Sequence, residues 1–165
     1  TYVRDCRAGR VSYLYDPAFQ IGSFTADELR QGIEGAQILV GNDYEIALIE
    51  DRLEISHEAL LVMGPKVIIT TLGSKGSIIA TRKGEIHIKP AQPKNVSDPT
   101  GAGDAYRAGF VAGYVRGFDL VTSGQMGSVA AVYTVEKYGT MTHEYTRAQF
   151  VKRYKENFGT SITLK

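Results

Sequence analysis

The residues of this chain whose types and spacing best suit chemistry form the run Asp98-Pro-Thr-Gly-Ala-Gly-Asp104. Gly101 and Gly103 flank a turn that leads into a helix, and the lone carboxylate of Asp104 follows them. The first N–H groups of a helix have no partner within it, so together with the helix dipole they can hold an anion. A carboxylate beside an anion cradle is what phosphoryl transfer to a hydroxyl requires. We therefore predict that Asp104 accepts the proton of an attacking hydroxyl; the alternative is that it only favours the helix N-terminus electrostatically.

The helix that follows this run has one nearly bare side. Each interior glycine costs about 1 kcal/mol relative to alanine in helix propensity. We therefore expect this side to pack closely against a neighbouring element and so to fix the helix start, which is a structural role. The small residues on this side are Gly101, Ala105, Ala108, Gly109, Ala112, Gly113 and Gly117.

A second candidate site is Asn42-Asp-Tyr-Glu45, directly after an apolar strand pattern. Ligands of open α/β sheets collect at the carboxyl ends of strands. There Glu45 could hold a Mg²⁺-bound water and Asn42 a phosphate oxygen. The same spacing is close to a helix capping box, and the sequence leaves both interpretations open.

A third candidate is Thr71-Leu-Gly73-Ser-Lys-Gly76, where a strand gives way to a glycine turn. Backbone N–H groups and the hydroxyl of Thr71 or Ser74 could face nucleotide phosphates there. A plain hairpin turn would have a similar sequence, so this pattern is weak by itself. The three histidines have no metal-ligand spacing to other ligands.

The elements that must position these residues alternate between apolar runs and helical patterns, which predicts an α/β fold with a largely parallel sheet. All three motifs lie at strand ends of this sheet, so we expect them to converge on one cleft. No repeat or linker is visible, which predicts a single domain over 1–165. Strands are expected at 11–15, 37–41 and 67–71, with a hairpin of 77–81 and 85–89. Helices are expected at 2–8, 25–35, from 42, 56–63, about 102–117, about 123–138 and from 146.

The composition is that of an ordinary globular protein, with 43% hydrophobic and 22% charged residues and a net charge of +1. No basic face stands out, which argues against nucleic acid or an anionic membrane as a partner. The charged start resembles no signal peptide, and no apolar run is long enough to span a bilayer, so we expect a cytoplasmic protein. Cys6, the single cysteine, is expected to be a buried thiol. The absence of an initiator Met suggests a fragment of a longer protein.

Taken in order, Asn42-x-x-Glu45, Thr71-x-Gly73-x-x-Gly76 and the 98–104 run resemble the motif set of the PfkB (ribokinase-like) family of sugar and nucleoside kinases. The resemblance covers nearly all of this chain but only the C-terminal half or so of a family member. It implies a ribokinase-like three-layer α/β/α fold with a largely parallel central sheet, incomplete at the N-terminus. Neither a Walker nor a Rossmann glycine pattern is present.

The resemblance assigns roles to these residues by position. Asp104 matches the catalytic base. The anion hole corresponds to Gly101, Ala102 and Gly103. Asn42 and Glu45 would serve Mg²⁺ and phosphate, while Thr71, Gly73, Ser74 and Gly76 belong to the ATP site. Asp98 and Thr100 match positions that in many members help to bind K⁺, but Pro99 stands where many relatives have Thr, which leaves K⁺ open.

The implied function is ATP-dependent phosphorylation of a hydroxymethyl group on a nucleoside or a sugar. The 98–109 segment and Glu136-Lys-Tyr-Gly-Thr140 are similar to adenosine- or nucleoside-kinase-like members, with ribose and fructose left open as acceptors. Family members carry most contacts to the acceptor in the N-terminal half, so the missing half is itself an expected partner. Alternatives are a nucleotide-binding or regulatory module without its own activity, and a fragment that associates through exposed apolar surface. The sequence leaves open whether the protein is a homo-oligomer.

Overall fold

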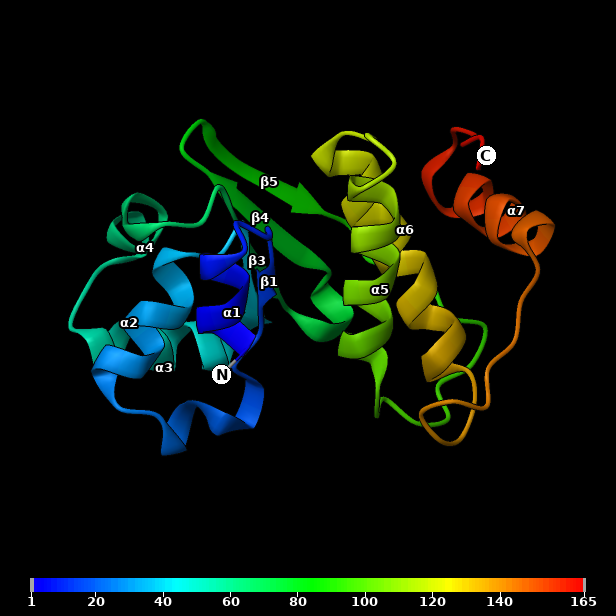
Figure 1. Cartoon of the computed structure of the whole chain (residues 1–165). Helices are drawn as coiled ribbons and strands as arrows, with labels where there is room; N and C mark the ends of the chain where they lie inside the picture. Colours follow the sequence, from blue (N-terminus) through cyan, green and yellow to red (C-terminus); the bar gives the residue numbers. More distant parts are fainter. Residues whose placement is uncertain (1, 165) are drawn as a thin grey trace. The chain divides into compact units, whose positions relative to one another are not determined.

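In the computed structural model of the chain, which describes residues 2–164, five strands form one sheet in the order β1-β2-β3-β4-β5 (Figure 1). Three of them, β1 (Leu14–Tyr15), β2 (Ile38–Asn42) and β3 (Val67–Thr71), run parallel to one another. The strands β4 (Ser77–Thr81) and β5 (Gly84–Ile88) are neighbours joined by a two-residue turn. So short a connection can join only antiparallel strands, and the predicted hairpin is confirmed.

The chain divides into two units. The first comprises the residues up to 73 together with 78–87, and the second comprises 74–77 and the residues from 88 onward. The chain therefore passes between the units three times, and the predicted single domain over 1–165 stays a prediction. Among residues 2–164, no helix is both long and apolar enough to cross a bilayer.

The helices of the first unit begin where the sequence places caps. The helix predicted at 25–35 begins with a capping box at Thr25: its hydroxyl accepts the Glu28 N–H at 3.2 Å, and the Glu28 carboxylate accepts the Thr25 N–H at 2.8 Å. Ser56 caps the helix predicted at 56–63 with its hydroxyl alone, which accepts the Ala59 N–H at 3.3 Å. The helices are α1 (Tyr2–Ala8), a 3₁₀ helix (Ala18–Ser23), α2 (Ala26–Glu34), α3 (Asp43–Leu53) and α4 (His57–Met63).

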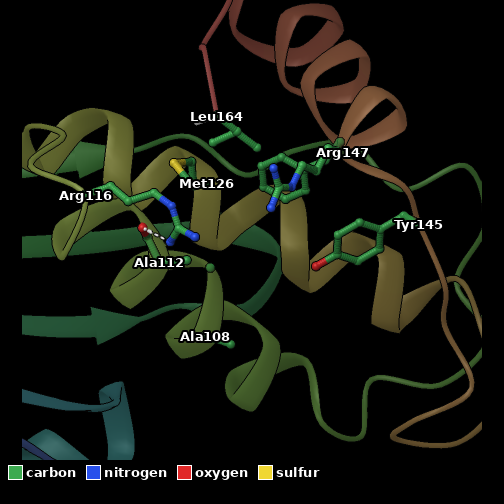
Figure 2. Close-up of a pocket in the computed structure, with 9 residues that line it drawn as sticks. Ala108, Ala112, Arg116, Met126, Tyr145, Arg147 and Leu164 are labelled. Carbon is green, nitrogen blue, oxygen red and sulfur yellow. Dashed lines mark hydrogen bonds between the residues drawn. The ribbon is translucent and has the colours of Figure 1, made fainter.

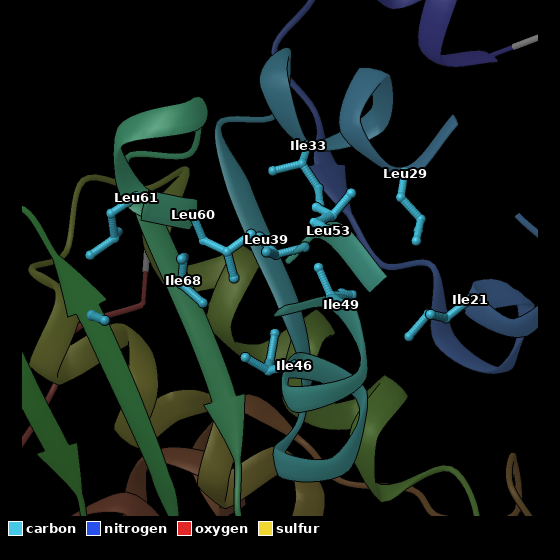
Figure 3. Close-up of a cluster of buried hydrophobic side chains, with 11 residues drawn as sticks. Ile21, Leu29, Ile33, Leu39, Ile46, Ile49, Leu53, Leu60, Leu61 and Ile68 are labelled. Carbon is cyan, nitrogen blue, oxygen red and sulfur yellow. The ribbon is translucent and has the colours of Figure 1, made fainter. Parts of the chain in front are cut away.

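The core of the first unit lies between these helices and the parallel strands. Figure 3 shows side chains from α2, α3 and α4 gathered around Leu39 of β2 and Ile68 of β3. Both strand residues are fully buried, and burial of one such side chain stabilises a fold by roughly 1.5–3 kcal/mol. The strands are thereby fixed, and with them the residues at their carboxyl ends.

The second unit is helical, with α5 (Ala102–Tyr114), α6 (Leu120–Val135) and α7 (Arg147–Phe158). The first two lie side by side (Figure 1), and their backbones nearly touch. A β-carbon added at Gly109 would lie 2.6 Å from the Met126 carbonyl oxygen, which no structure tolerates. The predicted close packing of the bare side of this helix is confirmed at this glycine.

The ends of the two long helices differ from the expected ones. The first stops at Tyr114, and Gly117 follows with a φ of +79°. The second begins at Leu120, three residues early, because the Asp119 side chain accepts the Thr122 N–H at 2.7 Å and caps it. It ends at Val135, so Gly139 lies in the following turn rather than at the helix end.

Two expectations for the first residues are also corrected. The strand predicted at 11–15 pairs only at Leu14 and Tyr15, opposite Ile38 and Leu39. It is the edge strand of the five, so nothing on its other side in the described chain extends it. Cys6 is half-buried on α1 rather than buried, since none of the residues of this helix is buried.

Candidate functional site

The start of α5 exposes unpaired backbone donors. Gly101 caps the helix with a φ of +83° and no side-chain cap. The Ala102 N–H donates to the Pro99 carbonyl at 3.1 Å. The next two N–H groups, of Gly103 and Asp104, make no hydrogen bond to any described residue. Of the residues predicted to form an anion hole, Ala102 thus has its N–H engaged, whereas the N–H groups of Gly101 and Gly103, together with that of Asp104, make no hydrogen bond to any described residue.

The Asp104 side chain is 79% exposed and is held from one side by Arg107. The guanidinium donates to Oδ1 at 2.5 Å, from one helical turn further on. Such a surface ion pair adds little stability, but it orients the carboxylate and leaves Oδ2 without a hydrogen bond in the described chain. The sequence analysis missed Arg107, although its spacing of three residues on a helix was a usable signal.

Asp98 ties the turn before α5 to a distant part of the second unit. Its Oδ1 accepts the Thr100 N–H at 2.9 Å, and its Oδ2 accepts the Gly139 N–H at 3.1 Å. The pKa of the Asp98 carboxyl is lowered most by hydrogen bonding to Thr100 and less by the hydrogen bond from Gly139. Both oxygens thus have a structural task, and K⁺ binding by Asp98 and Thr100 stays a prediction.

Asn42 and Glu45 form a full capping box at the start of α3. Asn42 Oδ1 accepts the Glu45 N–H at 2.8 Å, and Glu45 Oε2 accepts the Asn42 N–H at 2.8 Å. The structural interpretation of this motif is therefore realised. One carboxylate oxygen of Glu45 remains, and its predicted role toward Mg²⁺ stays a prediction.

Thr71 lies beside this box. Asn42 and Thr71 are paired residues at the carboxyl ends of β2 and β3, and the Thr71 hydroxyl lies 3.5 Å from the Gly41 carbonyl oxygen. The structure thus brings the second motif and the start of the third together in the first unit, as expected for neighbouring parallel strands.

The glycines of the third motif have different constraints. Gly73 has a φ of +58° and open space where a β-carbon would be. Gly76 has a φ of +95°, and a β-carbon there would lie 2.1 Å from the Ile88 carbonyl oxygen. Between them, Ser74 and Lys75 are exposed on a short 3₁₀ helix (Gly73–Lys75). The loop thus presents its tip to solvent, while Gly76 fixes its end.

The end of this loop meets the start of α5 within the second unit. The hydroxyls of Ser77 and Tyr106 are 2.6 Å apart in a buried hydrogen bond. No sequence pattern pointed to this pair. The Asn42–Thr71 pair belongs to the first unit, so convergence of all three motifs on one cleft stays a prediction.

A hollow of about 370 Å³ lies elsewhere on the second unit (Figure 2). None of the predicted site residues lines it. Its floor includes Ala108 and Ala112, so part of the bare side of α5 faces this hollow rather than a helix, and the Arg116 side chain folds back to donate to the Ala112 carbonyl at 2.8 Å. The lining residues are Ala108, Gly109, Ala112, Arg116, Met126, Tyr145, Arg147, Phe150 and Leu164.

The described residues contain no cluster of three His, Cys, Asp or Glu side chains that could hold a metal ion. They therefore do not support a metal site made of protein ligands alone. His57 is instead 2.7 Å from the Glu50 carboxylate. This does not conflict with Mg²⁺, which is usually held by one or two carboxylates together with waters and substrate phosphates. Glu45, with one carboxylate oxygen outside the capping box, can serve as such a carboxylate.

Comparison with known proteins adds an independent line of evidence. The family model described as "pfkB family carbohydrate kinase" matches residues 5–147. A nucleoside kinase of Methanothermobacter thermautotrophicus is 35% identical over 161 residues, which are 94% of this chain and 52% of that protein. The chain thus spans about half the length of the curated relatives it matches.

Solved structures agree in fold. Burkholderia thailandensis nucleoside kinase in complex with ADP-inosine matches with a TM-score of 0.94 and 31% identity, over 97% of this chain and 50% of that one. Methanocaldococcus jannaschii nucleoside kinase, described as an archaeal member of the ribokinase family, matches with a TM-score of 0.83 and 34% identity. The match covers 87% of this chain and 48% of that one. The predicted ribokinase-like α/β fold is confirmed.

Proposed function

Because the chain belongs to the pfkB family of carbohydrate kinases, we propose that this protein transfers the terminal phosphoryl group of ATP to a hydroxymethyl group of a nucleoside. The similar proteins named above are nucleoside kinases, and one of them was solved with ADP-inosine. These relatives favour a nucleoside over a free sugar as the acceptor. The complex with ADP-inosine favours a purine nucleoside, such as adenosine, among the nucleosides.

The observation that carries this proposal is the start of α5. Two N–H groups without internal acceptors, of Gly103 and Asp104, lie at the positive end of a helix of 13 residues. There they would bind the oxygens of the transferring phosphoryl group, whose negative charge is spread over three of them. Gly103 carries no side chain that could cover this position, and a β-carbon there would have Arg107 as its nearest neighbour at 3.6 Å.

Asp104 would act on the acceptor. Its Oδ2 has no hydrogen-bond partner in the described chain and can accept the proton of the attacking hydroxyl. Arg107 fixes the orientation of this carboxylate by donating a hydrogen bond to Oδ1. In a loose transition state the base mainly orients the hydroxyl and receives its proton late, so a strongly basic carboxylate is not needed.

Glu45 and Asn42 fit the support of Mg²⁺ and phosphate, respectively, in this proposal. When bound, Mg²⁺ neutralises charge on the phosphate oxygens. Glu45 would hold a water of its hydration shell through the carboxylate oxygen that the capping box leaves free. Thr71, Gly73, Ser74 and Gly76 would line the nucleotide side.

The test is Asp104→Asn in the protein at its full natural length. The amide keeps the shape and an oxygen that can accept from Arg107, but it cannot take a proton. We expect kcat to fall by about 100- to 10,000-fold while the Kd for ATP stays within about threefold of wild type. ADP release with adenosine, inosine, cytidine, ribose and fructose as acceptors measures kcat, and calorimetry measures the Kd. An equal loss of ATP binding would show that Asp104 has another role.

A nucleotide-binding module without its own transfer activity is the second candidate. It is favoured by the span of this chain, about half of that of its relatives. The two candidates separate in one assay of the protein at its full natural length: ATP binding without ADP release for any acceptor supports the module, and acceptor-dependent ADP release excludes it.

A further inference from the structure

A buried hydrogen bond links the neighbourhoods of two predicted nucleotide-binding segments. It joins the hydroxyls of Tyr106 and Ser77, which are 6% and 2% exposed. Tyr106 lies two residues after Asp104 on α5, and Ser77 directly follows Gly76. Both residues belong to the second unit, so the bond ties the first turns of α5 to the end of the 74–77 segment within one body.

Both ends of this bond are themselves fixed. On the α6 side, a β-carbon at Gly127 would lie 2.8 Å from the Tyr106 carbonyl oxygen and 3.2 Å from its ring, so the helix packs directly against the tyrosine. On the loop side, the Gly76 backbone lies against the Ile88 carbonyl. Burial raises the pKa of Tyr106 to about 12, so the hydroxyl stays neutral and the bond does not change with pH in the physiological range.

Tyr106 faces away from the reacting groups. Two residues turn an α-helix by about 200°, which places Tyr106 on the buried side when Asp104 is on the exposed side. The tyrosine therefore touches neither phosphate nor acceptor. Any effect on the reaction must act through the position of the helix start.

We propose that Tyr106 and Ser77 form a positioning pair that sets the distance between the open amides of Gly103 and Asp104 and the loop around Ser74. The proposal rests on the function proposed above, in which both segments bind the phosphates of one nucleotide. A phosphoryl group reacts only when it is held in line with its acceptor, and a misplacement of about 1 Å can cost a factor of about 100 in rate. A direct hydrogen bond between two hydroxyl groups, each held on a rigid segment, limits such misplacement.

Three variants separate positioning from stability: Tyr106→Phe, Ser77→Ala and the double variant. Each single change leaves one buried hydroxyl unpaired and should lower Tm, whereas the double change removes both and should restore much of Tm. We expect kcat/KM for ATP to fall roughly 10- to 100-fold in each single variant and to stay low in the double variant. In a pair that served stability alone, kcat/KM would recover together with Tm.

Tyr154→Phe is the matched control. Tyr154 is also a buried tyrosine of the second unit, and its hydroxyl donates to Gln125, away from both segments. This variant should lower Tm while kcat/KM for ATP remains that of wild type.

The outcomes distinguish this inference from the function on which it rests. Suppose that Asp104→Asn inactivates the protein but Tyr106→Phe keeps the wild-type kcat/KM. This result overturns the positioning pair and leaves the kinase proposal intact. If the wild type transfers phosphate to no acceptor, the kinase proposal fails. The pair is then judged by the Kd for ATP in calorimetry, where an unchanged Kd in Tyr106→Phe overturns it and a roughly tenfold weaker one supports it.

Discussion

Gly101 and Gly103 stand two residues apart in the same turn and are glycines for different reasons. Gly101 has a φ of +83°, and a β-carbon there would lie 3.2 Å from Cβ of Thr140. Gly103 is within the helix, and a β-carbon would meet nothing closer than 3.6 Å. The first glycine is required by the backbone, whereas only a ligand would require the second.

This difference predicts opposite results for two alanine substitutions. Gly101→Ala should destabilise the fold by about 1–2 kcal/mol, because alanine is strained in the left-handed region. Gly103→Ala should leave stability unchanged or raise it by up to about 1 kcal/mol, because alanine favours helices, and yet weaken ATP binding by covering the open amides. Chemical denaturation and calorimetry measure the two quantities. Full ATP affinity in Gly103→Ala would argue against an anion site there.

Among residues 2–164, three helices begin with the same reciprocal capping arrangement, and one of them bears a predicted function. The boxes at Thr25–Glu28 and Asn42–Glu45 use a glutamate, whereas that at Thr146–Gln149 uses a glutamine. In the last, the Gln149 amide oxygen accepts the Thr146 N–H at 2.7 Å. An uncharged side chain therefore completes such a box in this protein.

Glu45→Gln is accordingly expected to keep the cap and remove the charge. Tm should stay within a few degrees of wild type, since a cap is worth about 1 kcal/mol even when lost entirely. The dependence of ATP binding on Mg²⁺ should weaken if the carboxylate supports the metal. Glu28→Gln is the matched control and should change neither quantity. An unchanged Mg²⁺ titration in Glu45→Gln would reduce the motif to helix capping.

A buried ion pair connects α6, α7 and the segment before α5 in the second unit. Glu136 accepts two hydrogen bonds from Arg153, at 2.8 and 3.2 Å, and one from the Lys94 N–H at 2.6 Å. The guanidinium also lies 5.0 Å from the centre of the Tyr133 ring. Burial by itself would raise the pKa of Glu136, but the hydrogen bonds outweigh it and hold this pKa below its ordinary value of 4.5.

The lowered pKa of Glu136 gives the direction in which this ion pair makes the stability of the fold depend on pH. A carboxylate with a lowered pKa in the folded state stabilises the fold above the unfolded-state pKa, and that contribution is lost as the pH falls through the folded-state pKa. Tm should therefore drop below about pH 4.5. Glu136→Gln should lower stability by about 3–5 kcal/mol at pH 7, by leaving Arg153 without its counter-charge, and should flatten the acid drop. Glu34→Gln, at an exposed position of α2, should keep the wild-type profile of Tm against pH.

The predicted single domain can be tested on the same scale. One domain should unfold in one cooperative transition, although two units are distinguished in the structure. Hydrogen exchange followed by mass spectrometry reports on the opening of each unit. In one cooperative domain, the slowest-exchanging amides of β2 and of α6 should have the same opening free energy and the same dependence on denaturant. Two separate values would mean that the units fold independently.

Features that depend on neighbouring residues could be predicted from the amino-acid sequence. The boxes at Thr25 and Thr146 follow from capping residues, the strand Val67–Thr71 from a continuous run of β-branched residues, and the glycine turn before Asp104 from backbone freedom, all within a few positions. Order along the chain was also enough to recognise the family, because the specific run at 98–104 follows two weaker motifs in the order typical of its members.

Contacts between residues far apart in the sequence could not be predicted and became visible in the folded chain. The bond between Ser77 and Tyr106 spans 29 positions, and that between Asp98 and Gly139 spans 41. The short extent of β1 likewise depends on where its partner strand begins. No local pattern encodes such contacts, because each exists only when the packing of helices and strands has brought both partners to one place.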